Sequence, residues 1–439
     1  MTGQMWPGQA DRQDGEGCPA GSFARRSFLQ GLAATGLVAA VAENHSPTVE
    51  GRQHGAPGPV EGPSLPAVPF YGDHQAGIIN PPPNSRQEFA TFAAFDVTAA
   101  NRRELTELFR TLTAQAAFLT AGGKAPTARP GSPPPDDGIL GPQIPADALT
   151  VTVGAGASLF DGRYGLSASK PVQLVPMKPF RHDDLDPAIS GGDLLIQLCA
   201  GSRDTVVHAL LETIAAASGA MKLRWNIDGF ANPPRPVGVP RDWFGFKDGI
   251  TNPDPASTAL MNQWVWVQPH TGEPAWAAGG TYQVVRIIHF DVERWQGVPV
   301  AQQERIFGRR KVSGAPMYAL DRNASDLLDP IYTNDPQGLI TPLNSHIRLA
   351  NPQTPQTAPT STILRRSYDF ELSLRTSGYP DLGHAFCCFQ RELDSYIAMQ
   401  TRLEGEMLVP YVSPRGGGYF FALPGVRDDQ DYYARGLLA

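Results

Sequence analysis

Apolar and polar positions along this chain predict two successive sets of strands and helices in the same order. Apolar residues alternate with polar ones in the strand-like runs and recur every three or four positions in the helical runs. The first set has the order strand, helix, strand, strand, helix, strand, at residues 89–97, 98–119, 149–160, 193–200, 204–218 and 221–230. This β-α-β-β-α-β order is that of a ferredoxin-like domain.

The two helices of the first set are predicted from their apolar faces, and Thr98 or Asn101 is the candidate N-cap of the first. The residues at helical spacing are Leu105, Leu108, Phe109 and Leu112 in the first helix and Val207, Leu210, Leu211 and Ile214 in the second. We expect these side chains to be buried. The proline-rich residues 121–146 lack any periodicity and predict an exposed loop.

The second set repeats the order of the first. Its elements are predicted at residues 281–292, 300–307, 366–374, 383–390, 393–403 and 417–423. The chain therefore predicts an α+β fold of tandem ferredoxin-like domains, residues 67–235 and 236–439, whose antiparallel sheets have helices on one face and pack through their uncovered faces. An irregular insertion at 309–361 is the longest in either set, and long ordered insertions often carry functional sites.

Residues 1–42 have the pattern of a twin-arginine signal peptide. Arg25 and Arg26 precede an uncharged run from residue 31 to 42, which ends in the small-x-small sequence Ala40-Val41-Ala42. The run is too short to span a bilayer, which takes about 20 apolar residues. We expect export by the twin-arginine route to the periplasm or the exterior, followed by a Pro/Gly-rich linker at residues 43–66.

Composition narrows the possible functions. The 439 residues are 41% hydrophobic and 18% charged, as in globular proteins, and the net charge of −7 argues against general nucleic-acid binding. Of the 4 cysteines, Cys18 lies in the predicted signal peptide, and the other three have no C-x-x-C spacing. Neither a zinc site nor a disulfide framework is predicted, and we expect Cys199, Cys387 and Cys388 to be small core residues.

Asp248 is the candidate acid–base residue. It lies in Gly-Phe-Lys-Asp-Gly-Ile-Thr-Asn-Pro, residues 245–253, between two glycines that permit a sharp turn. Trp243 and Phe246 are close in sequence, and a carboxylate beside aromatic side chains can have its pKa tuned for proton exchange. An Asp before a Gly is also ordinary turn chemistry, so the residues alone leave both interpretations open.

His346 differs from the other histidines because it shares a predicted turn with Arg348, in Asn-Ser-His-Ile-Arg-Leu-Ala-Asn-Pro at residues 344–352. The basic pair Arg365 and Arg366 follows further along the chain. Acid, imidazole and guanidinium together are what a haem peroxidase needs, since it has one ligand below the iron and an acid–base group and a cation above it. We expect surface or satisfied core positions for His182, His208, His289 and His384, while His74 is linked to no chemistry.

The chain resembles the dye-decolourising peroxidases (DyP), and within them the secreted deferrochelatase/peroxidase branch. The likeness is carried by Gly-x-x-Asp-Gly at 245–249, His-Ile-Arg-x-x-Asn-Pro at 346–352, Leu-Arg-Arg at 364–366, Ile-Phe-Gly-Arg at 306–309 and Gly-Gly-Gly-Tyr-Phe-Phe-Ala-Leu-Pro-Gly at 416–425. It extends from about residue 67 to residue 433. The family also implies the tandem ferredoxin-like fold that the periodicity predicts independently.

The resemblance implies one haem b per chain and assigns residue roles by position. His346 would be the proximal iron ligand, Asp248 the distal acid–base residue, and Arg365, rather than Arg366, the distal cation. The residues that would contact haem are Gly249, Ile250, Thr251, Arg309, His346, Asn351, Pro352, Gln353 and Arg365. Gln353 departs from the family pattern, in which an Arg is common at this position.

The implied activity is reduction of hydrogen peroxide coupled to oxidation of dyes, phenols or other one-electron donors. The alternative within the same branch is a deferrochelatase, which releases iron from haem, leaves the porphyrin intact and works with an iron-uptake permease. A cofactor-free α+β binding module stays open from the residues alone. Only the peroxidase needs both Asp248 and Arg365, and a homo-oligomer is compatible with all three.

Overall fold

The structure is a computed structural model that describes residues 65–80 and 86–439. The predicted signal peptide, residues 1–42, and the predicted linker up to residue 64 lie outside the described residues. The described residues all belong to one compact unit. No helix within the described ranges is both long and apolar enough to cross a membrane.

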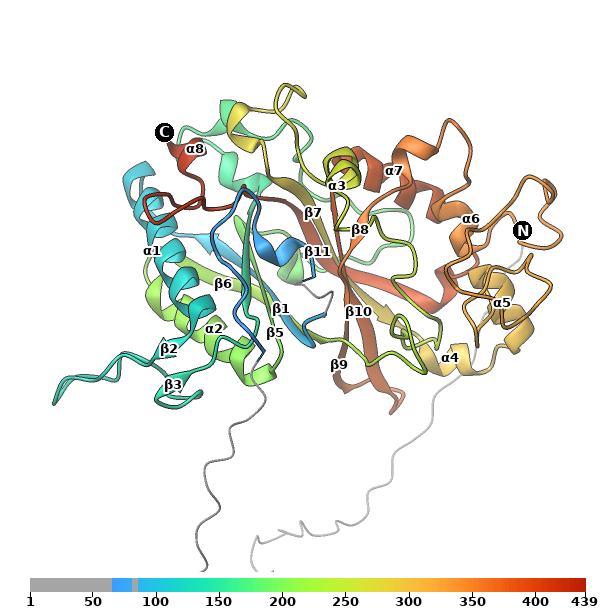
Figure 1. The fold of residues 1–439 in the computed structure, drawn as a ribbon, viewed down its shortest axis with the longest axis horizontal. Helices are drawn as coiled ribbons and strands as arrows, with labels where there is room; N and C mark the ends of the chain where they lie inside the picture. The colour runs from blue at the N-terminus through green and yellow to red at the C-terminus, as the bar shows by residue number, and fades with distance from the viewer. Residues whose placement is uncertain (1–64, 81–85) are drawn as a thin grey trace, which may run out of the picture. The chain divides into compact units, whose positions relative to one another are not determined.

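The first half of this unit is a four-stranded antiparallel sheet with two helices (Figure 1). The sheet order is β4-β5-β1-β6. In chain order the elements are β1 (Phe89–Val97), α1 (Arg102–Ala121), β4 (Thr150–Gly156), β5 (Leu194–Ala200), α2 (Arg203–Ala216) and β6 (Met221–Phe230). The helix α1 begins after Asn101, whose side chain accepts a hydrogen bond from the N–H of Glu104, so Asn101 is the N-cap and Thr98 is not.

The second half repeats this arrangement with the sheet order β11-β7-β10-β9. Its main elements are β7 (Thr281–Phe290), α4 (Val292–Gln296), α5 (Val300–Phe307), β9 (Tyr368–Leu374), β10 (Pro380–Gln390), α7 (Leu393–Leu403) and β11 (Val412–Ala422). In both halves the first and third strands lie at the centre of the sheet. The predicted tandem ferredoxin-like fold is confirmed.

The shorter elements lie between or beside these strands and helices. They are β2 (Gly123–Lys124), β3 (Gln143–Ile144), α3 (Thr258–Trp264), α6 (His346–Ala350), β8 (Leu364–Arg365) and α8 (Arg435–Leu438). The segment at 121–146 is largely exposed, as expected, but β2 and β3 pair at its base. The predicted insertion at 309–361 carries α6, and β8 pairs with β10.

The two sheets are also joined at their edges. Phe420 of β11 pairs with Gly156 of β4, and Phe230 of β6 pairs with Asp369 of β9. Eight strands are therefore paired in the order β7-β11-β4-β5-β1-β6-β9-β10, and the pairing of β10 with β7 closes the ring. One buried cluster draws on strands of both halves, including Phe92, Val285 and Phe420, whereas alternate residues of the same strands pack with the helices. The sequence predicted contact between the sheet faces but not this edge pairing.

The apolar face predicted for α2 is confirmed only in part, since Leu210 and Ile214 are partly buried against the core whereas Leu211 lies toward solvent. The buried residues of α2 are Thr205, Val206, His208, Ala209 and Thr213, and Leu211 is 43% exposed. Polar partners explain this rotation. Thr205 donates a hydrogen bond to Asp147 at 2.9 Å, and His208 is paired with Asp137 at 2.8 Å, which makes burial of these polar side chains tolerable.

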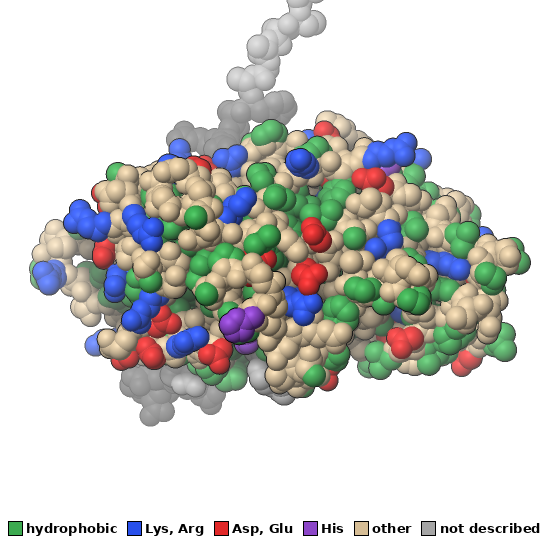
Figure 2. All heavy atoms as spheres, turned by 90° about the horizontal axis from the view of Figure 1, so that it is seen from above, with side chains coloured by type: hydrophobic (Ala, Val, Ile, Leu, Met, Phe, Trp, Pro, Cys, Tyr) green, Lys and Arg blue, Asp and Glu red, His purple; other side chains and the backbone are tan. Residues whose placement is uncertain are grey.

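Figure 2 shows one face of the molecule, on which acidic and basic side chains are interspersed among apolar and uncharged ones. This face has no continuous basic stripe, in keeping with the net charge of −7. Cys199, Cys387 and Cys388 are free and buried, which confirms the prediction that they are core residues.

Candidate active site

A cavity of about 490 Å³ lies in the second half of the fold, against the 242–253 loop, α6, β10 and α7. Its size is typical of a cofactor or small-ligand pocket. Apolar side chains supply much of its lining, among them Phe246, Ile288, Phe307, Phe386, Met399 and Leu403. Among the residues predicted to bind haem, the cavity is lined by Gly249, Ile250, Thr251, Arg309, His346, Asn351, Gln353 and Arg365. Pro352 does not line it, so the structure places this one predicted contact outside the cavity.

His346 is the first residue of α6 and is anchored by a carboxylate. Its Nδ1 lies 2.6 Å from Oε2 of Glu406, which also lines the cavity. Burial alone would lower the pKa of His346, but the negative charge of Glu406 outweighs it and raises this pKa above its usual value. A ring whose Nδ1 is bonded to a carboxylate presents Nε2 as its remaining ligand atom.

Arg348 does not join this site. Its guanidinium forms an ion pair of 3.2 Å with Asp335 and donates hydrogen bonds to the carbonyl oxygens of Thr341 and Asp335. Arg348 therefore ties residues 335–341 to α6, and of the two side chains only that of His346 lines the cavity.

Asp248 lies in a loop shaped by its two flanking glycines. Gly245 and Gly249 have φ values of 82° and 84°, which favour glycine, so both are needed for the turn. The Asp248 carboxylate forms an ion pair of 3.2 Å with Arg365. Asn252 fixes the backbone of Arg365 through two hydrogen bonds, one to its N–H and one to its carbonyl oxygen. Asp248 thus lies in a glycine turn and also lines the cavity.

The pKa of Asp248 is lowered. Burial would raise it, but the positive charge of Arg365, followed by those of His384 and Arg86, outweighs the burial. Asp248 is therefore a carboxylate at neutral pH and remains one in mildly acid solution.

Arg365 and Arg366 point to different places, as neighbours in an extended segment do. Arg365 lines the cavity, whereas Arg366 is buried and donates to Oε1 of Gln87. This placement agrees with the selection of Arg365 from the basic pair.

Sequence reasoning missed His384 as part of this cluster. Its Nδ1 is 2.8 Å from Oδ1 of Asp369, and its Nε2 is 3.6 Å from Oδ2 of Asp248. His384 and Asp369 face each other across the β9–β10 register. Only this register brings them together, so no local sequence signal could have identified the pair. Glu406 was also missed, because it is 60 residues from its partner His346 and no local sequence signal links the two.

Within the described ranges, the remaining histidines carry no comparable arrangement toward this cavity. His74 stacks on Trp266 with ring centroids 3.9 Å apart, and its Nδ1 lies 2.7 Å from the carbonyl oxygen of Gly279. His289 pairs with Asp381 at 2.8 Å and does not line the cavity. Both are satisfied structural histidines, as expected for His289.

Asp242, also missed, is another carboxyl group in the cavity lining. Burial, and then the negative charges of Asp248 and Asp369, raise its pKa to about 7. Its Oδ1 accepts a hydrogen bond from the N–H of Phe246. Of these two aspartates in the cavity lining, Asp248 is ionised at neutral pH, whereas Asp242 is protonated in a large fraction of molecules.

Asp242→Asn is expected to reduce the loss of stability as the pH rises from about 4 to about 7. A raised folded-state pKa gives a contribution to stability that is complete below the unfolded value of about 3.9 and is lost as the pH rises through about 7. Asn keeps the hydrogen-bond acceptor without the charge, so the melting temperature of the variant should fall less than that of the wild type between pH 5 and 8.

The matched control for this measurement is Asp321→Asn. Asp321 also accepts a backbone N–H, from Asn323, but is exposed and does not line the cavity. Parallel melting curves of the wild type and Asp242→Asn across this pH range would contradict the raised pKa.

The whole described fold is similar to known proteins. Two family models match it, "Dyp-type peroxidase, N-terminal" over residues 75–231 and "Dyp-type peroxidase, C-terminal" over residues 239–427. A protein of Escherichia coli (strain K12) named deferrochelatase is 46% identical over 376 residues, which cover 84% of this chain and 87% of that protein. A deferrochelatase of Yersinia pestis is 45% identical over 375 residues, 84% of each chain.

Solved structures agree with these matches. The DyP-type peroxidase from Cellulomonas bogoriensis aligns with a TM-score of 0.74 and 30% identity, over 86% of this chain and 99% of that one. Ferric DtpA from Streptomyces lividans aligns with a TM-score of 0.75 and 31% identity, over 85% of this chain and 97% of that one. The similarity therefore extends over both halves of the fold and includes the cavity.

Proposed function

We propose that this chain, which belongs to the DyP-type peroxidase family, reduces hydrogen peroxide with one haem b bound in the cavity between His346 and Asp248. The observation that supports this most strongly is that one cavity holds two different functional pairs, His346 with Glu406 and Asp248 with Arg365. A binding module that only enclosed haem would have no use for the second pair. A cofactor-free module would need neither.

The residues of the cavity fit a haem. A porphyrin needs apolar walls, an axial imidazole and groups that accept its two propionates. Phe246 and Phe307 stack with centroids 4.0 Å apart in the wall, and Phe307 lies 5.9 Å from the His346 ring. Arg309 and Arg365 also line the cavity and carry the positive charge that propionates require. Gln353, unlike an Arg, would offer only a neutral hydrogen bond.

A bound haem would supply an iron that takes two oxidising equivalents from hydrogen peroxide and passes them to donors one electron at a time. His346 would hold the iron through Nε2 while Glu406 fixes the orientation of its ring and makes the imidazole more electron-rich. The imidazole would then bind iron through Nε2 and the Glu406 carboxylate through Nδ1.

Asp248 would move the proton. As a carboxylate, it takes a proton from one peroxide oxygen and returns it to the other, so that water leaves when the O–O bond breaks. Arg365, in contact with Asp248, stabilises the negative charge that develops on the departing oxygen. His384, held by Asp369, fixes the second oxygen of Asp248 from another direction.

Arg365→Ala is expected to shift the acid limb of the pH–rate profile to higher pH. The charge of Arg365 is the largest influence that lowers the pKa of Asp248, so without it burial raises this pKa. Since the mechanism needs the carboxylate form, activity should then fail at a higher pH, on top of a loss of about 10²–10³-fold in rate. The measurement is the rate of peroxide consumption from pH 3 to pH 8.

Arg322→Ala is the control, because Arg322 pairs with Glu304 and does not line the cavity. An acid limb at the same pH in the wild type and in Arg365→Ala would show that Arg365 does not tune the proton-transferring group.

A second candidate function is release of iron from haem with the porphyrin left intact. It is favoured by the 44–46% identity to proteins named deferrochelatase. The two functions separate in one experiment on the haem-loaded protein, with guaiacol oxidation followed beside the fluorescence of metal-free porphyrin. Peroxide-dependent guaiacol oxidation without porphyrin release supports the peroxidase, whereas porphyrin release without oxidation supports the second function.

We also propose export by the twin-arginine route, in line with Arg25, Arg26 and the apolar run that follows. An iron-uptake permease would then be a partner at the membrane. Changing both arginines to Lys should retain the protein in the cytoplasm, which fractionation followed by immunoblotting measures. Unchanged export of the double variant would contradict this route.

A further inference from the structure

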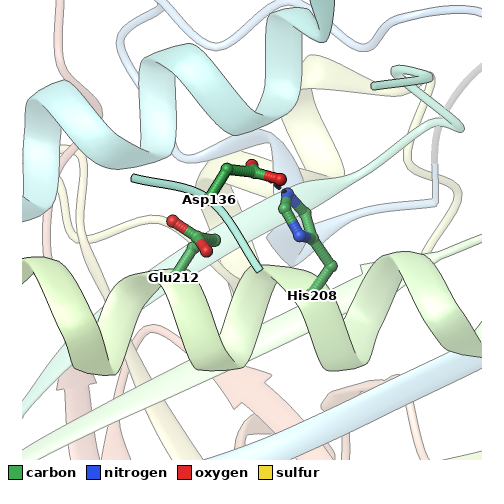
Figure 3. A group of neighbouring side chains, drawn as sticks. All are labelled: Asp136, His208 and Glu212. Carbon is green, nitrogen blue, oxygen red and sulfur yellow. Dashed lines mark ion pairs between the residues drawn. The ribbon is translucent and has the colours of Figure 1, made fainter. Parts of the chain in front are cut away.

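Three potential metal ligands meet where the segment between β2 and β3 crosses α2. They are Asp136, His208 and Glu212, whose ligand atoms all lie within 4.8 Å of one another (Figure 3). His208 and Glu212 are one helical turn apart on α2, so their side chains share a face. None of the three lines the cavity of the proposed haem site.

His208 is fully buried and one of its nitrogens has no hydrogen-bond partner. The residue is 0% exposed, and its Nε2 forms no hydrogen bond. This nitrogen lies 3.8 Å from Oδ2 of Asp136, and Figure 3 shows the imidazole beside that carboxylate. Burying an unsatisfied polar nitrogen is costly, so its persistence here calls for a ligand.

The other nitrogen of His208 is already oriented. Nδ1 lies 2.8 Å from Oδ1 of Asp137. With Nδ1–H donated to this carboxylate, Nε2 keeps a free lone pair in a position 3.8 Å from Oδ2 of Asp136. A carboxylate behind a histidine is the usual arrangement around metal-binding imidazoles, because it fixes the tautomer and makes the ligand more basic.

Backbone N–H groups hold the two ligand carboxylates. Gly138 donates to Oδ1 of Asp136 at 2.8 Å, and Asp137 donates to Oε1 of Glu212 at 2.9 Å. Within the described part of the chain, no Lys or Arg forms an ion pair with either carboxylate or with Asp137. Three carboxylates are thus gathered around one imidazole without another cation, which favours a bound positive ion.

We propose that Asp136, His208 and Glu212 bind a divalent first-row transition-metal ion, with Asp137 positioning the imidazole. One nitrogen and two carboxylate ligands suit Zn²⁺ and its neighbours better than Mg²⁺ or Ca²⁺, which prefer oxygen alone. The ion pins the proline-rich segment at 121–146 to α2. Small side-chain rotations bring the three atoms to metal–ligand distances of about 2 Å.

The probe is ZnCl₂, titrated by calorimetry into the full haem-loaded chain after treatment with EDTA. We expect one high-affinity Zn²⁺ per chain that Asp136→Asn and Glu212→Gln each weaken by about 10-fold or more. Replacement of His208 could disturb folding because the residue is fully buried, so the test relies on these two size-matched variants. Glu107→Gln is the control, since Glu107 is an exposed acid on the neighbouring helix α1 and lies outside the cluster.

Asp137→Asn tests the positioning role. It should weaken Zn²⁺ binding by about 10–100-fold with the stoichiometry unchanged. A purely structural role would instead lower the melting temperature of the metal-free protein and leave the affinity alone. The haem absorption spectrum should be the same in all these variants, so failure of the haem proposal and failure of this one are distinguishable.

Absence of Zn²⁺ uptake, or uptake that Asp136→Asn and Glu212→Gln leave unchanged, would overturn the proposal. The cluster would then be a buried His–Asp ion pair that only secures the segment to α2.

Discussion

Asp248→Asn is expected to slow the reaction with hydrogen peroxide by about 10²–10⁴-fold, the usual contribution of a positioned proton-transferring group. Asn keeps the size of the side chain and can still accept a hydrogen bond from Arg365, but it cannot take up a proton from peroxide. Haem binding should be preserved, because no part of Asp248 is required to hold the iron. Stopped-flow absorption of the haem band after mixing with peroxide measures the rate.

Asp329→Asn is the matched control for this variant. Asp329 also lines the cavity but forms no ion pair with Arg365. Its rate should stay close to that of the wild type. If Asp248→Asn reacts with peroxide as fast as Asp329→Asn, then Asp248 is not the proton-transferring residue.

His346→Ala is expected to weaken haem binding by more than about 100-fold. Loss of a residue that merely orients a metal ligand already costs about 10–100-fold, and loss of the ligand itself should cost more. The substitution also leaves the Glu406 carboxylate without its partner in a poorly hydrated place. Titration of haem into the apoprotein, followed by its Soret absorption, gives the affinity.

Two controls make this result specific to ligation. His289→Ala removes a histidine that is likewise paired with a carboxylate, Asp381, yet lies outside the cavity, and it should bind haem normally. Added imidazole should restore the axial ligand and the spectrum of His346→Ala. Wild-type affinity and an unaltered iron spectrum in His346→Ala would remove His346 from the iron.

The fold could be predicted from local sequence because both halves repeat a clear periodic pattern of apolar residues. The bounds of β1, α5, β6 and α7 agree with their predicted ranges. The buried face of α2 was predicted only in part, since hydrophobicity alone cannot reveal that His208 and Thr205 find partners in distant loops. The edge pairing of β11 with β4 depends on the association of two halves, which no local pattern encodes.

In the site, too, local motifs could be recognised from the sequence, whereas contacts between distant residues could not. Asp248, His346 and Arg365 were recognisable because each stands in a short motif, and the structure brings all three to one cavity. Glu406 and His384 had no motif. Their importance arises from contacts across 60 residues in one case and across a strand register in the other. Sequence motifs thus identified three residues that meet in the cavity but not the residues that contact them there.

The central claim is that haem iron binds His346 in the cavity shared with Asp248 and Arg365. Crystals of the haem-loaded protein, measured at the iron absorption edge, test it most directly. We expect one iron peak per chain, within coordination distance of Nε2 of His346 and with the Asp248–Arg365 pair across the haem plane. An iron peak outside this cavity, or one coordinated by another side chain, would contradict it.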